Sequence, residues 1–333
     1  MGRRARCAAA VAVRLRASHH RRRPPGGDVR GRAEAGAEAV TSLPSDGLPV
    51  PPEPPAPSAL PRVPDAPLFA HRTAVVTGGG GGIGAGIVRA LIWHGARVVL
   101  ADVDAGAARR TADLAAEESG AEPEIVVGDI RAPDTVAELT DLAGPADFLV
   151  NNVGDYRPAG PFLTSDETDW QHMYDLNLLH ILRVTRAFLP GMAERGRGGI
   201  VNLTSVEGLR GIPGNAVYGA FKAAVVNFTA SLAAEVGQYG IRVNAVAPDL
   251  TDSPQTPMWA GTRAKYADHV GSWVPVGRFG HASDHGDAVV FLLSEQSRFI
   301  TGETLRVDGG TLAAPGWFRR DEQRFTNMPR PLH

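Results

Sequence analysis

The amino-acid sequence predicts an α/β protein with a doubly wound parallel sheet in a single domain, residues 68–312. Three observations support this prediction. Short apolar segments rich in β-branched residues alternate with longer helical segments, a glycine-rich turn follows the first apolar segment, and polar residues stand directly after several others. The hydrophobic fraction of 43% is ample for the core that such a domain needs.

Residues 1–67 differ in composition from the rest. Residues 1–27 are rich in Ala and Arg and contain no acidic residue, and ten prolines fall within the 24 residues 44–67. Such a segment buries too little apolar surface to offset its ordering entropy, so we expect a disordered tail. An Arg-rich, acid-poor start is also typical of transit peptides. A cluster such as Arg21–Arg23 is typical of segments that contact nucleic acid or acidic lipid. We favour a third interpretation, a tail without specific function that arises from an over-extended start site.

The first predicted strand, Thr73–Thr77, runs into five consecutive glycines, Gly78–Gly82, then Ile83, Gly84 and a predicted helix. A glycine turn between a strand and a helix is typical of dinucleotide binding. Glycines let the backbone approach a pyrophosphate, and the helix N-terminus offers free N–H groups and a positive dipole end. A flexible loop is the alternative interpretation of five glycines.

The second predicted strand, Arg97–Ala101, ends in Asp102, 24 residues after Gly78. A carboxylate at this distance is expected to bind the 2′-hydroxyl of the adenosine ribose. A 2′-phosphate would meet a like charge, and at ~4 Å and an effective dielectric of ~20 this costs about 4 kcal/mol, roughly a thousandfold in affinity. The glycine turn holds no basic residue, and Arg97 stands at the far end of the strand, so we predict NAD rather than NADP. The alternative is a solvated Asp102 that caps the next helix.

The alternation continues along the chain. Helices are predicted over 107–118, 135–142 and 170–188, and strands over 124–127, 148–150, 200–205 and 241–246. Ligands of parallel sheets bind beyond the carboxyl ends of the strands. Five features stand at such ends and are therefore predicted to share one site: the Gly78 turn, Asp102, Asp129, Asn152 and Ser205.

The predicted reaction centre lies between Ser205 and Lys222. Tyr218 and Lys222 are four residues apart at the start of a predicted helix, so they share a face, and the loop before them is long enough to fold Ser205 over it. A hydroxyl, a phenol and an ammonium together indicate proton transfer to or from an alcohol or carbonyl. A free phenol has a pKa of about 10, and we expect the ammonium to lower it.

Lysine usage favours this interpretation over an ordinary helix-surface pair. Of the 34 basic residues only two are lysines, Lys222 and Lys265. A chain that uses arginine almost everywhere else therefore keeps a lysine four residues after a tyrosine. A compact ammonium with an adjustable pKa suits this chemistry, and a guanidinium cannot replace it.

Together these motifs resemble those of the short-chain dehydrogenase/reductase family, over roughly Leu68 to Gly310. Thr77–Gly84 resembles the family's cofactor loop, Asn151–Gly154 its Asn-Asn-Ala-Gly motif with one conservative change, and Val307–Gly310 its usual end. The spacings of the family's catalytic tetrad fall on Asn177, Ser205, Tyr218 and Lys222. The resemblance implies a Rossmann-like fold and an NAD(P)-dependent enzyme.

The resemblance also implies a role for each residue. Tyr218 protonates a carbonyl oxygen or deprotonates an alcohol, and Lys222 lowers its pKa and binds the nicotinamide ribose. Ser205 holds the substrate oxygen, and Asn177 supports a water relay to Lys222. The implied cofactor contacts are Gly78, Gly82, Ile83, Gly84, Asp102, Asp129, Ile130, Asn152, Gly154, Tyr218, Lys222, Pro248 and Ser253.

The sequence departs from the family pattern at two positions. Pro248 is followed by Asp249, where the family has a glycine beside the nicotinamide, and Ser253 replaces the usual threonine. Residues 313–333 extend beyond the usual end. Trp317 and Phe318 favour packing of this extension across a subunit interface or over the active site, with a frayed terminus as the alternative.

Residues 250–280 are predicted to form a lid over the site. This segment contains Pro254, Pro257, Met258, Trp259, Tyr266 and Trp273. The aromatic residues are compatible with an apolar or ring-containing substrate and equally with ordinary helix packing.

The sequence thus predicts an oxidoreductase that interconverts a secondary alcohol and a ketone with NAD. An NADPH-dependent 3-oxoacyl-thioester reductase is the first alternative, which Asp102 disfavours. A nucleotide-binding protein without catalysis is the second, which the complete tetrad disfavours. The resemblance implies a homo-oligomer, either a tetramer or a dimer.

Composition excludes several other classes. A net charge of −2 implies no global attraction to nucleic acid or membrane. The lone Cys7 permits no internal disulfide. The histidines show no convincing metal-ligand spacing. His281 and His285 are four residues apart, but Ser283 and Asp284 between them indicate a helix cap. We therefore expect no metal. No apolar run approaches the roughly 18 residues of a membrane helix, so we expect a cytoplasmic protein.

Overall fold

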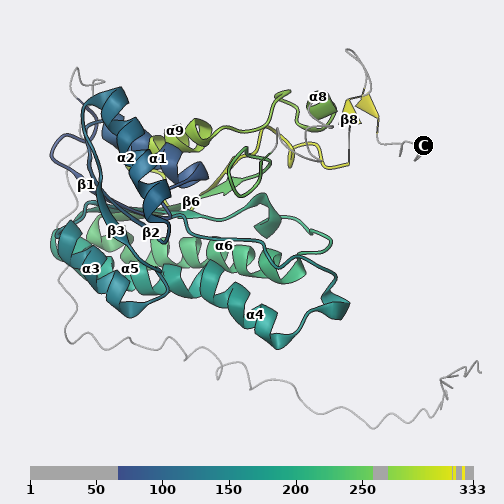
Figure 1. Cartoon of the computed structure of the whole chain (residues 1–333), viewed down its shortest axis with the longest axis horizontal. Coiled ribbons are helices and arrows are strands. Elements are labelled where there is room, and N and C mark those ends of the chain that lie inside the picture. Colours follow the sequence, from purple (N-terminus) through teal and green to yellow (C-terminus); the bar gives the residue numbers. More distant parts are fainter. Residues whose placement is uncertain (1–66, 258–268, 317, 320–324, 327–333) are drawn as a thin grey trace, which may run out of the picture. The chain divides into compact units, whose positions relative to one another are not determined.

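Seven parallel strands form one sheet in the computed structural model, which describes residues 67–257, 269–316, 318–319 and 325–326. The strand order is β3-β2-β1-β4-β5-β6-β7, and helices flank the sheet (Figure 1). This confirms the predicted Rossmann-like, doubly wound α/β fold. The predicted disordered tail, residues 1–67, lies outside the described residues except for Pro67.

The chain fills the sheet outward from its centre. From β1 (Thr73–Thr77) it passes to β2 (Arg97–Asp102) and β3 (Glu124–Val127) on one side. It then fills the other side with β4 (Phe148–Asn151), β5 (Gly198–Leu203), β6 (Ile241–Pro248) and β7 (Thr304–Val307). The order reverses between β1 and β4, and a ligand-binding crevice is expected at the carboxyl ends of the strands there.

Helices cover both faces of the sheet. One face carries α1 (Gly82–Trp93), α2 (Ala105–Ser119) and α9 (Ala282–Leu293), and the other carries α3 (Pro133–Ala143), α5 (His180–Glu194) and α6 (Ala216–Val236). Neighbouring strand residues therefore pack into opposite layers. Val76 joins the first layer and Val75 the second, and both are fully buried, which explains why the strands read as continuous apolar runs.

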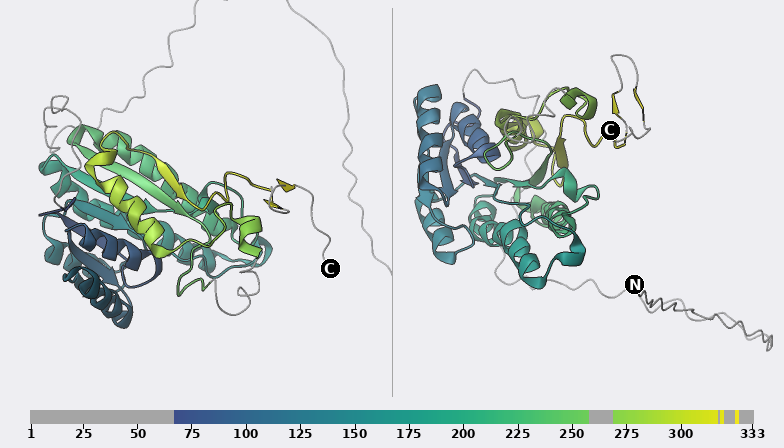
Figure 2. Two further views of the ribbon diagram at one scale, coloured as in Figure 1. Left: turned by 90° about the horizontal axis from the view of Figure 1, so that it is seen from above. Right: turned by 45° about the vertical axis from the view of Figure 1, so that its right-hand side comes forward.

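Two glycines bring α1 and α9 into backbone contact. A Cβ on Gly86 would lie 2.4 Å from the carbonyl oxygen of Ala282, and one on Gly286 would lie 2.7 Å from that of Gly86. In the left view of Figure 2 the yellow-green α9 lies over the strands. This close packing fixes α1, whose N-terminus follows the glycine turn.

The single helix predicted over 170–188 is wrong in its details. The structure has α4 (Glu167–Tyr174), a π-helical turn η2 (Asp175–Leu179) and then α5. Asp166 caps α4 by accepting from the N–H groups of Thr168 and Asp169. The π-helical turn contains Asn177, and such wider turns are frequent at functional sites.

The expectation about membrane-length apolar runs is wrong for one helix. Within the described residues, Ala216–Tyr239 is long and apolar enough to span a membrane by length and composition alone, with a mean hydropathy of 1.2. This segment comprises α6 and the 3-10 turn η4 (Gly237–Tyr239). Its Leu232 and Val236 are buried in the layer between the helix and the sheet, and 28% of its apolar window is buried.

The remaining elements are short. They are η1 (Phe162–Thr164), η3 (Val206–Gly208), α8 (Val270–Trp273), η6 (Glu295–Ser297), β8 (Phe318–Arg319) and β9 (Phe325–Thr326). β8 and β9 pair antiparallel within the predicted C-terminal extension. Met258, Trp259, Tyr266 and Trp317 lie outside the described residues. Trp273 is 55% exposed.

Candidate active site

The glycine turn adopts a conformation that only glycine accommodates easily. Gly78 and Gly82 have φ of 65° and 52°, and a Cβ on Gly84 would lie 1.9 Å from the carbonyl oxygen of Gly78. The N-cap of α1 is Gly81, and no side chain caps that helix end. Its first N–H groups are therefore available to an anion, and the turn fits the pyrophosphate of a dinucleotide.

Asp102 lies directly against this turn. Its carboxylate accepts from the N–H of Gly80 at 2.8 Å and from that of Asp104 at 3.0 Å. The cap of α2 is Asp104, which accepts from Ala107, so the alternative interpretation of Asp102 as the helix cap is wrong. Arg97 donates to the carbonyl oxygens of Leu142 and Ala143 at the far end of β2, as the sequence placed it.

Asn152 joins the end of β4 to the turn. Its amide donates to the carbonyl oxygens of Thr77 at 3.1 Å and Gly78 at 2.9 Å. Through this side chain Asn152 holds the turn in place. Thr77 contributes to the same connection, because its hydroxyl oxygen accepts from the Asn152 N–H at 3.0 Å.

The carboxylate of Asp129 already has a partner. Arg131 donates to both of its oxygens, with Nη2 2.6 Å from Oδ2. These hydrogen bonds from Arg131 hold the pKa of Asp129 below its ordinary value. A cofactor contact here would come more readily from the backbone of Asp129 and Ile130 than from the paired carboxylate.

The segment after β6 returns to the glycine turn. A Cβ on Gly82 would lie 3.1 Å from the Cβ of Ser253. The Ser253 hydroxyl oxygen accepts from the N–H of Thr256 at 3.1 Å. Pro248 is the last residue of β6 and pairs with Val307 of β7. The structure therefore brings Ser253 to the predicted cofactor crevice.

The loop that carries Ser205 folds onto α6, as expected from its length. The Thr204 hydroxyl donates to the carbonyl oxygen of Lys222 at 2.7 Å, and a Cβ on Gly208 would lie 2.7 Å from the Lys222 carbonyl carbon. Ser205 lies close enough to Tyr218 to act on the pKa of its phenol, so the fold brings two members of the predicted tetrad together.

Lys222 is buried beneath Tyr218. It is 3% exposed, and its ammonium donates to the carbonyl oxygen of Leu203 at 3.1 Å. Its Nζ lies 5.7 Å from the centroid of the Tyr218 ring. Burial lowers the pKa of Lys222 to about 8.

The expected lowering of the Tyr218 pKa is wrong for this structure. Burial raises the pKa of Tyr218 to about 12; the hydrogen bond with Ser205 acts in the opposite direction, and the charges of Glu207 and Asp155 raise it further. The Lys222 ammonium is directed at the Leu203 carbonyl, so its charge does not offset the burial of the phenol.

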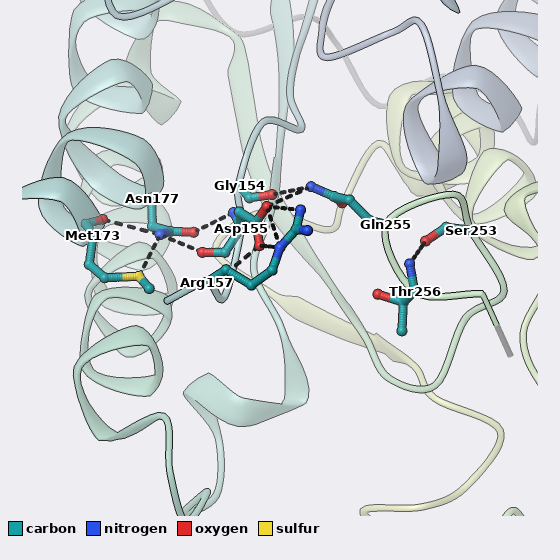
Figure 3. A network of polar contacts seen from close by, with 8 residues as sticks. All are labelled: Gly154, Asp155, Arg157, Met173, Asn177, Ser253, Gln255 and Thr256. Atoms are coloured by element: carbon teal, nitrogen blue, oxygen red, sulfur yellow. Dashed lines mark hydrogen bonds and ion pairs between the residues drawn. The ribbon is translucent and has the colours of Figure 1, made fainter. Parts of the chain in front are cut away.

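Asn177, the remaining predicted tetrad residue, lies beside Asp155 and Met173 (Figure 3). Its amide nitrogen donates to the carbonyl oxygens of Asp155 at 2.9 Å and Met173 at 3.1 Å, and its Oδ1 accepts from the Asp155 N–H at 3.2 Å. A Cβ on Gly154 would lie 2.8 Å from Nζ of Lys222 and 3.0 Å from Oδ1 of Asn177. All four predicted tetrad residues thus lie around one point.

Sequence reasoning missed a polar bridge across the crevice. Asp155 accepts three hydrogen bonds from the guanidinium of Arg157, with Nη2 2.5 Å from Oδ2. Gln255, on the segment after β6, donates to Oδ2 of Asp155 at 3.3 Å and to the Gly154 carbonyl at 3.4 Å (Figure 3). The position of Asp155 directly after the Asn151–Gly154 motif was the one available signal.

A pocket of about 160 Å³ opens beside Tyr218. Its walls include Pro158, Phe162, Trp170 and Val217. The rings of Phe162 and Trp170 are stacked, with centroids 5.4 Å apart. This wall offers an apolar surface in the same pocket as Tyr218.

Asp249, where the family has glycine, is held in an ion-pair network. Its Oδ2 accepts from Nη2 of Arg210 at 3.0 Å and from the hydroxyl of Thr311. The same Nη2 donates to Oε1 of Glu207 at 3.0 Å. The side chain of Asp249 is 7% exposed.

The histidines near α9 have structural partners. His281 is the N-cap of α9, and its N–H donates to Asp284 at 2.7 Å, so the expected helix cap is present, with His281 as the N-cap residue and Asp284 as its partner. His285 pairs with the Thr251 hydroxyl at 2.8 Å. In the part of the chain that the structure describes, no group of three or more His, Cys, Asp or Glu residues is arranged to hold a metal.

A dinucleotide-binding turn and a Ser–Tyr–Lys group on one edge of a parallel sheet define an NAD(P)-dependent oxidoreductase. Residues 78–311 match the family model described as enoyl-(acyl carrier protein) reductase. The chain belongs to the short-chain dehydrogenase/reductase family.

The relatives of this chain have several different activities. 2-(S)-Hydroxypropyl-CoM dehydrogenase 3 of Xanthobacter autotrophicus is 39% identical over 73% of this chain and 97% of that protein. A 3-oxoacyl-(acyl-carrier-protein) reductase of Chlamydia muridarum is 36% identical over 73% of this chain and 98% of that protein. Among solved structures, a variant of actinorhodin polyketide ketoreductase with NADPH is 32% identical, with a TM-score of 0.67, over 74% of this chain and 98% of that one.

Proposed function

We propose that this enzyme interconverts a secondary alcohol and a ketone with NAD, and that Tyr218 is the acid/base. The observation that carries the proposal is the convergence of four side chains. Ser205 lies near enough to act on the Tyr218 phenol, Lys222 lies beneath the Tyr218 ring, and Asn177 and Lys222 meet at Gly154.

Each side chain has a distinct task in the proposed reaction. The nicotinamide, when bound, supplies or accepts the hydride. Ser205 donates a hydrogen bond to the substrate oxygen, and Tyr218 transfers the proton. Tyr218 with a pKa of about 12 is protonated at neutral pH, and in this form it can donate the proton when a carbonyl is reduced. Alcohol oxidation requires the phenolate, which the ammonium of Lys222 favours when it is directed at the phenol.

The cofactor preference rests on Asp102. Its carboxylate lies on the glycine turn beside Gly80, with Arg97 at the opposite end of the strand. A 2′-phosphate at that carboxylate would be repelled, whereas a ribose hydroxyl would donate to it. We therefore propose NAD, with Gly78, Gly82 and Gly84 around the pyrophosphate and Ser253 near the nicotinamide end.

The alternative is an NADPH-dependent 3-oxoacyl-thioester reductase. It is favoured by the name of the Chlamydia muridarum relative and by the description of the matching family model. It requires that Asp102 accommodate a 2′-phosphate, so the cofactor preference separates the two functions.

The organisation of the protein is part of the proposal. Residues 68–312 would form the catalytic domain, followed by the extension 313–333, and the protein would be a cytoplasmic dimer or tetramer. Fully exposed Leu163 and Phe299 are compatible with burial against another subunit.

The experiment that tests the proposal is steady-state kinetics of Tyr218→Phe on a panel of secondary alcohols and ketones with each cofactor. Turnover should fall at least about a thousandfold, because the proton donor is lost, while NADH affinity stays within a few-fold. Tyr174→Phe is the matched control, since Tyr174 is also next to α6, where its ring contacts Phe221, and it should keep full turnover. Retained turnover in Tyr218→Phe would overturn the mechanism.

A further inference from the structure

We propose that Arg210 is a specificity-determining residue that binds a second, neutral oxygen of the substrate. The inference rests on the proposed alcohol–ketone activity and names the class of substrate for that site. Such substrates carry a hydroxyl or carbonyl oxygen near the reacting carbon, as vicinal diols and hydroxyketones do.

Arg210 lies beside the reaction centre. Leu203 of β5 pairs with Val246 of β6. Ser205 stands two residues after Leu203, and Pro248 stands two residues after Val246. Arg210 follows the η3 turn on the β5 side, and its Nη2 reaches Asp249, directly after Pro248. The guanidinium therefore bridges the two strand ends that carry the substrate-binding hydroxyl and the predicted nicotinamide contact.

Two carboxylates hold the guanidinium in place. Nη2 donates to Glu207 and to Asp249, each at 3.0 Å, and their side chains are 13% and 7% exposed. Glu207 is itself anchored beside Ser205, because its N–H donates to the Ser205 hydroxyl oxygen at 3.2 Å. Arg210 is thus pre-organised relative to the reacting oxygen, which reduces the entropy lost on binding.

Part of the Arg210 guanidinium is available to bind another group. Within the described residues Arg210 uses Nη2 alone, and its Nε and Nη1 make no hydrogen bond there, while its side chain is 30% exposed. An arginine offers five N–H donors in a fixed plane. The unshared edge can donate to a substrate oxygen.

The local charge favours a neutral oxygen over a carboxylate or phosphate. Glu207 and Asp249 carry two negative charges against the single positive charge of Arg210. An anionic group would therefore meet net repulsion, whereas a hydroxyl or carbonyl oxygen would accept a hydrogen bond without a charge penalty.

The test compares kcat/KM for cyclohexanol and for the cyclohexanediol whose two hydroxyl groups are on neighbouring carbons. The two compounds share one carbon skeleton. The expected ratio in favour of the diol is at least about tenfold, because a hydrogen bond to a charged group is gained. Cyclohexanol carrying a carboxylate at the same position should be a poorer substrate than the diol. The corresponding hydroxyketone, assayed for reduction, distinguishes a hydroxyl from a carbonyl as the second oxygen.

Arg210→Lys separates recognition from structure. A lysine can still pair with Glu207 and Asp249 but lacks the second edge of donors, so the diol preference should fall to about threefold or less. The melting temperature should stay close to that of the parent protein. Arg298→Lys is the matched control, because Arg298 bonds only to the nearby Glu295 carbonyl in the described structure and should keep the full preference.

Three results would overturn the inference. An equal kcat/KM for cyclohexanol and the diol, a diol preference that persists in Arg210→Lys, or a preference for the carboxylate would each do so. Failure of the proposed function itself would look different, since no alcohol or ketone would then turn over although NADH binds.

Discussion

Gly154 and Lys222 meet so closely that a single methyl group would separate them. A Cβ on Gly154 would lie 2.8 Å from Nζ of Lys222 and 3.0 Å from Oδ1 of Asn177. The ammonium is the movable end of a long side chain, so an added Cβ would displace it at little cost to the fold. The backbone of the Asn151–Gly154 motif therefore limits where the Lys222 ammonium can lie.

Gly154→Ala is expected to lower turnover by about a hundredfold, because a displacement of about 1 Å at a reacting group has an effect of this size. The measurement is kcat on the best alcohol found, with thermal unfolding as the check on folding. Gly237→Ala, in the turn after α6, is the control, since a Cβ there has no atom within 4 Å. Equal losses in the two variants would contradict the role of Gly154.

The residues at the strand ends could be predicted because strong local signals mark the strands. Thr73–Thr77 and Glu124–Val127 are strands with the predicted bounds, and β2 ends at Asp102 as expected. Short apolar runs rich in β-branched residues and bounded by turn residues are typical of buried parallel strands. The location of Asp102, Asn152 and Ser205 at one edge followed from that alternation alone.

Other features depend on tertiary packing and left no such signal. The apolar residues over 170–188 carry no clear mark of a π-helical turn, so the prediction of one helix missed η2. The contact of Gln255 with Asp155 depends on the path of the segment after β6. The raised pKa of Tyr218 depends on how completely the fold buries the phenol, and the sequence indicated only that Lys222 is close.

Asp102→Asn is expected to narrow the preference for NADH over NADPH by at least about tenfold, because the charge that repels a 2′-phosphate is removed. The amide oxygen can still accept from Gly80, so the glycine turn keeps its shape. Fluorescence titrations with NADH and NADPH measure both affinities. Asp104→Asn is the control, since asparagine caps a helix as well as aspartate does and the cofactor preference should not change.

The parent protein answers a prior question in the same titration. Tighter binding of NADH would support the proposed cofactor. Tighter binding of NADPH would contradict it and make the 3-oxoacyl-thioester reductase the leading function.

Lys222 should make the stability of the cofactor-free protein rise with pH. Its pKa is about 8 in the folded protein and 10.5 in the unfolded chain, so between these values the unfolded chain binds more protons. The free energy of unfolding therefore rises as the pH passes from 8 towards 10.5, by up to about 3 kcal/mol. Tyr218 acts in the opposite direction only above pH 10, because burial raises its pKa from 10 to about 12.

Denaturant unfolding between pH 7 and pH 10 measures this effect. Lys222→Met keeps most of the side-chain volume but has no group that titrates. In this variant the free energy of unfolding should rise less between pH 8 and pH 10 than in the parent protein. An equal rise in both proteins would show that another group is responsible.

Asp249 is expected to stabilise the protein as well as to position Arg210. Its nearly buried carboxylate joins the loop after β5, through Arg210, to the segment after β7, through Thr311. Asp249→Asn removes the charge and weakens both contacts, so the free energy of unfolding should fall by about 1–3 kcal/mol. Asp287→Asn on the exposed face of α9 is the control and should change it by less than about 0.5 kcal/mol. If Asp249→Asn were as stable as the control, the network would not hold the two segments together, and the guanidinium of Arg210 would depend on Glu207 alone for its position.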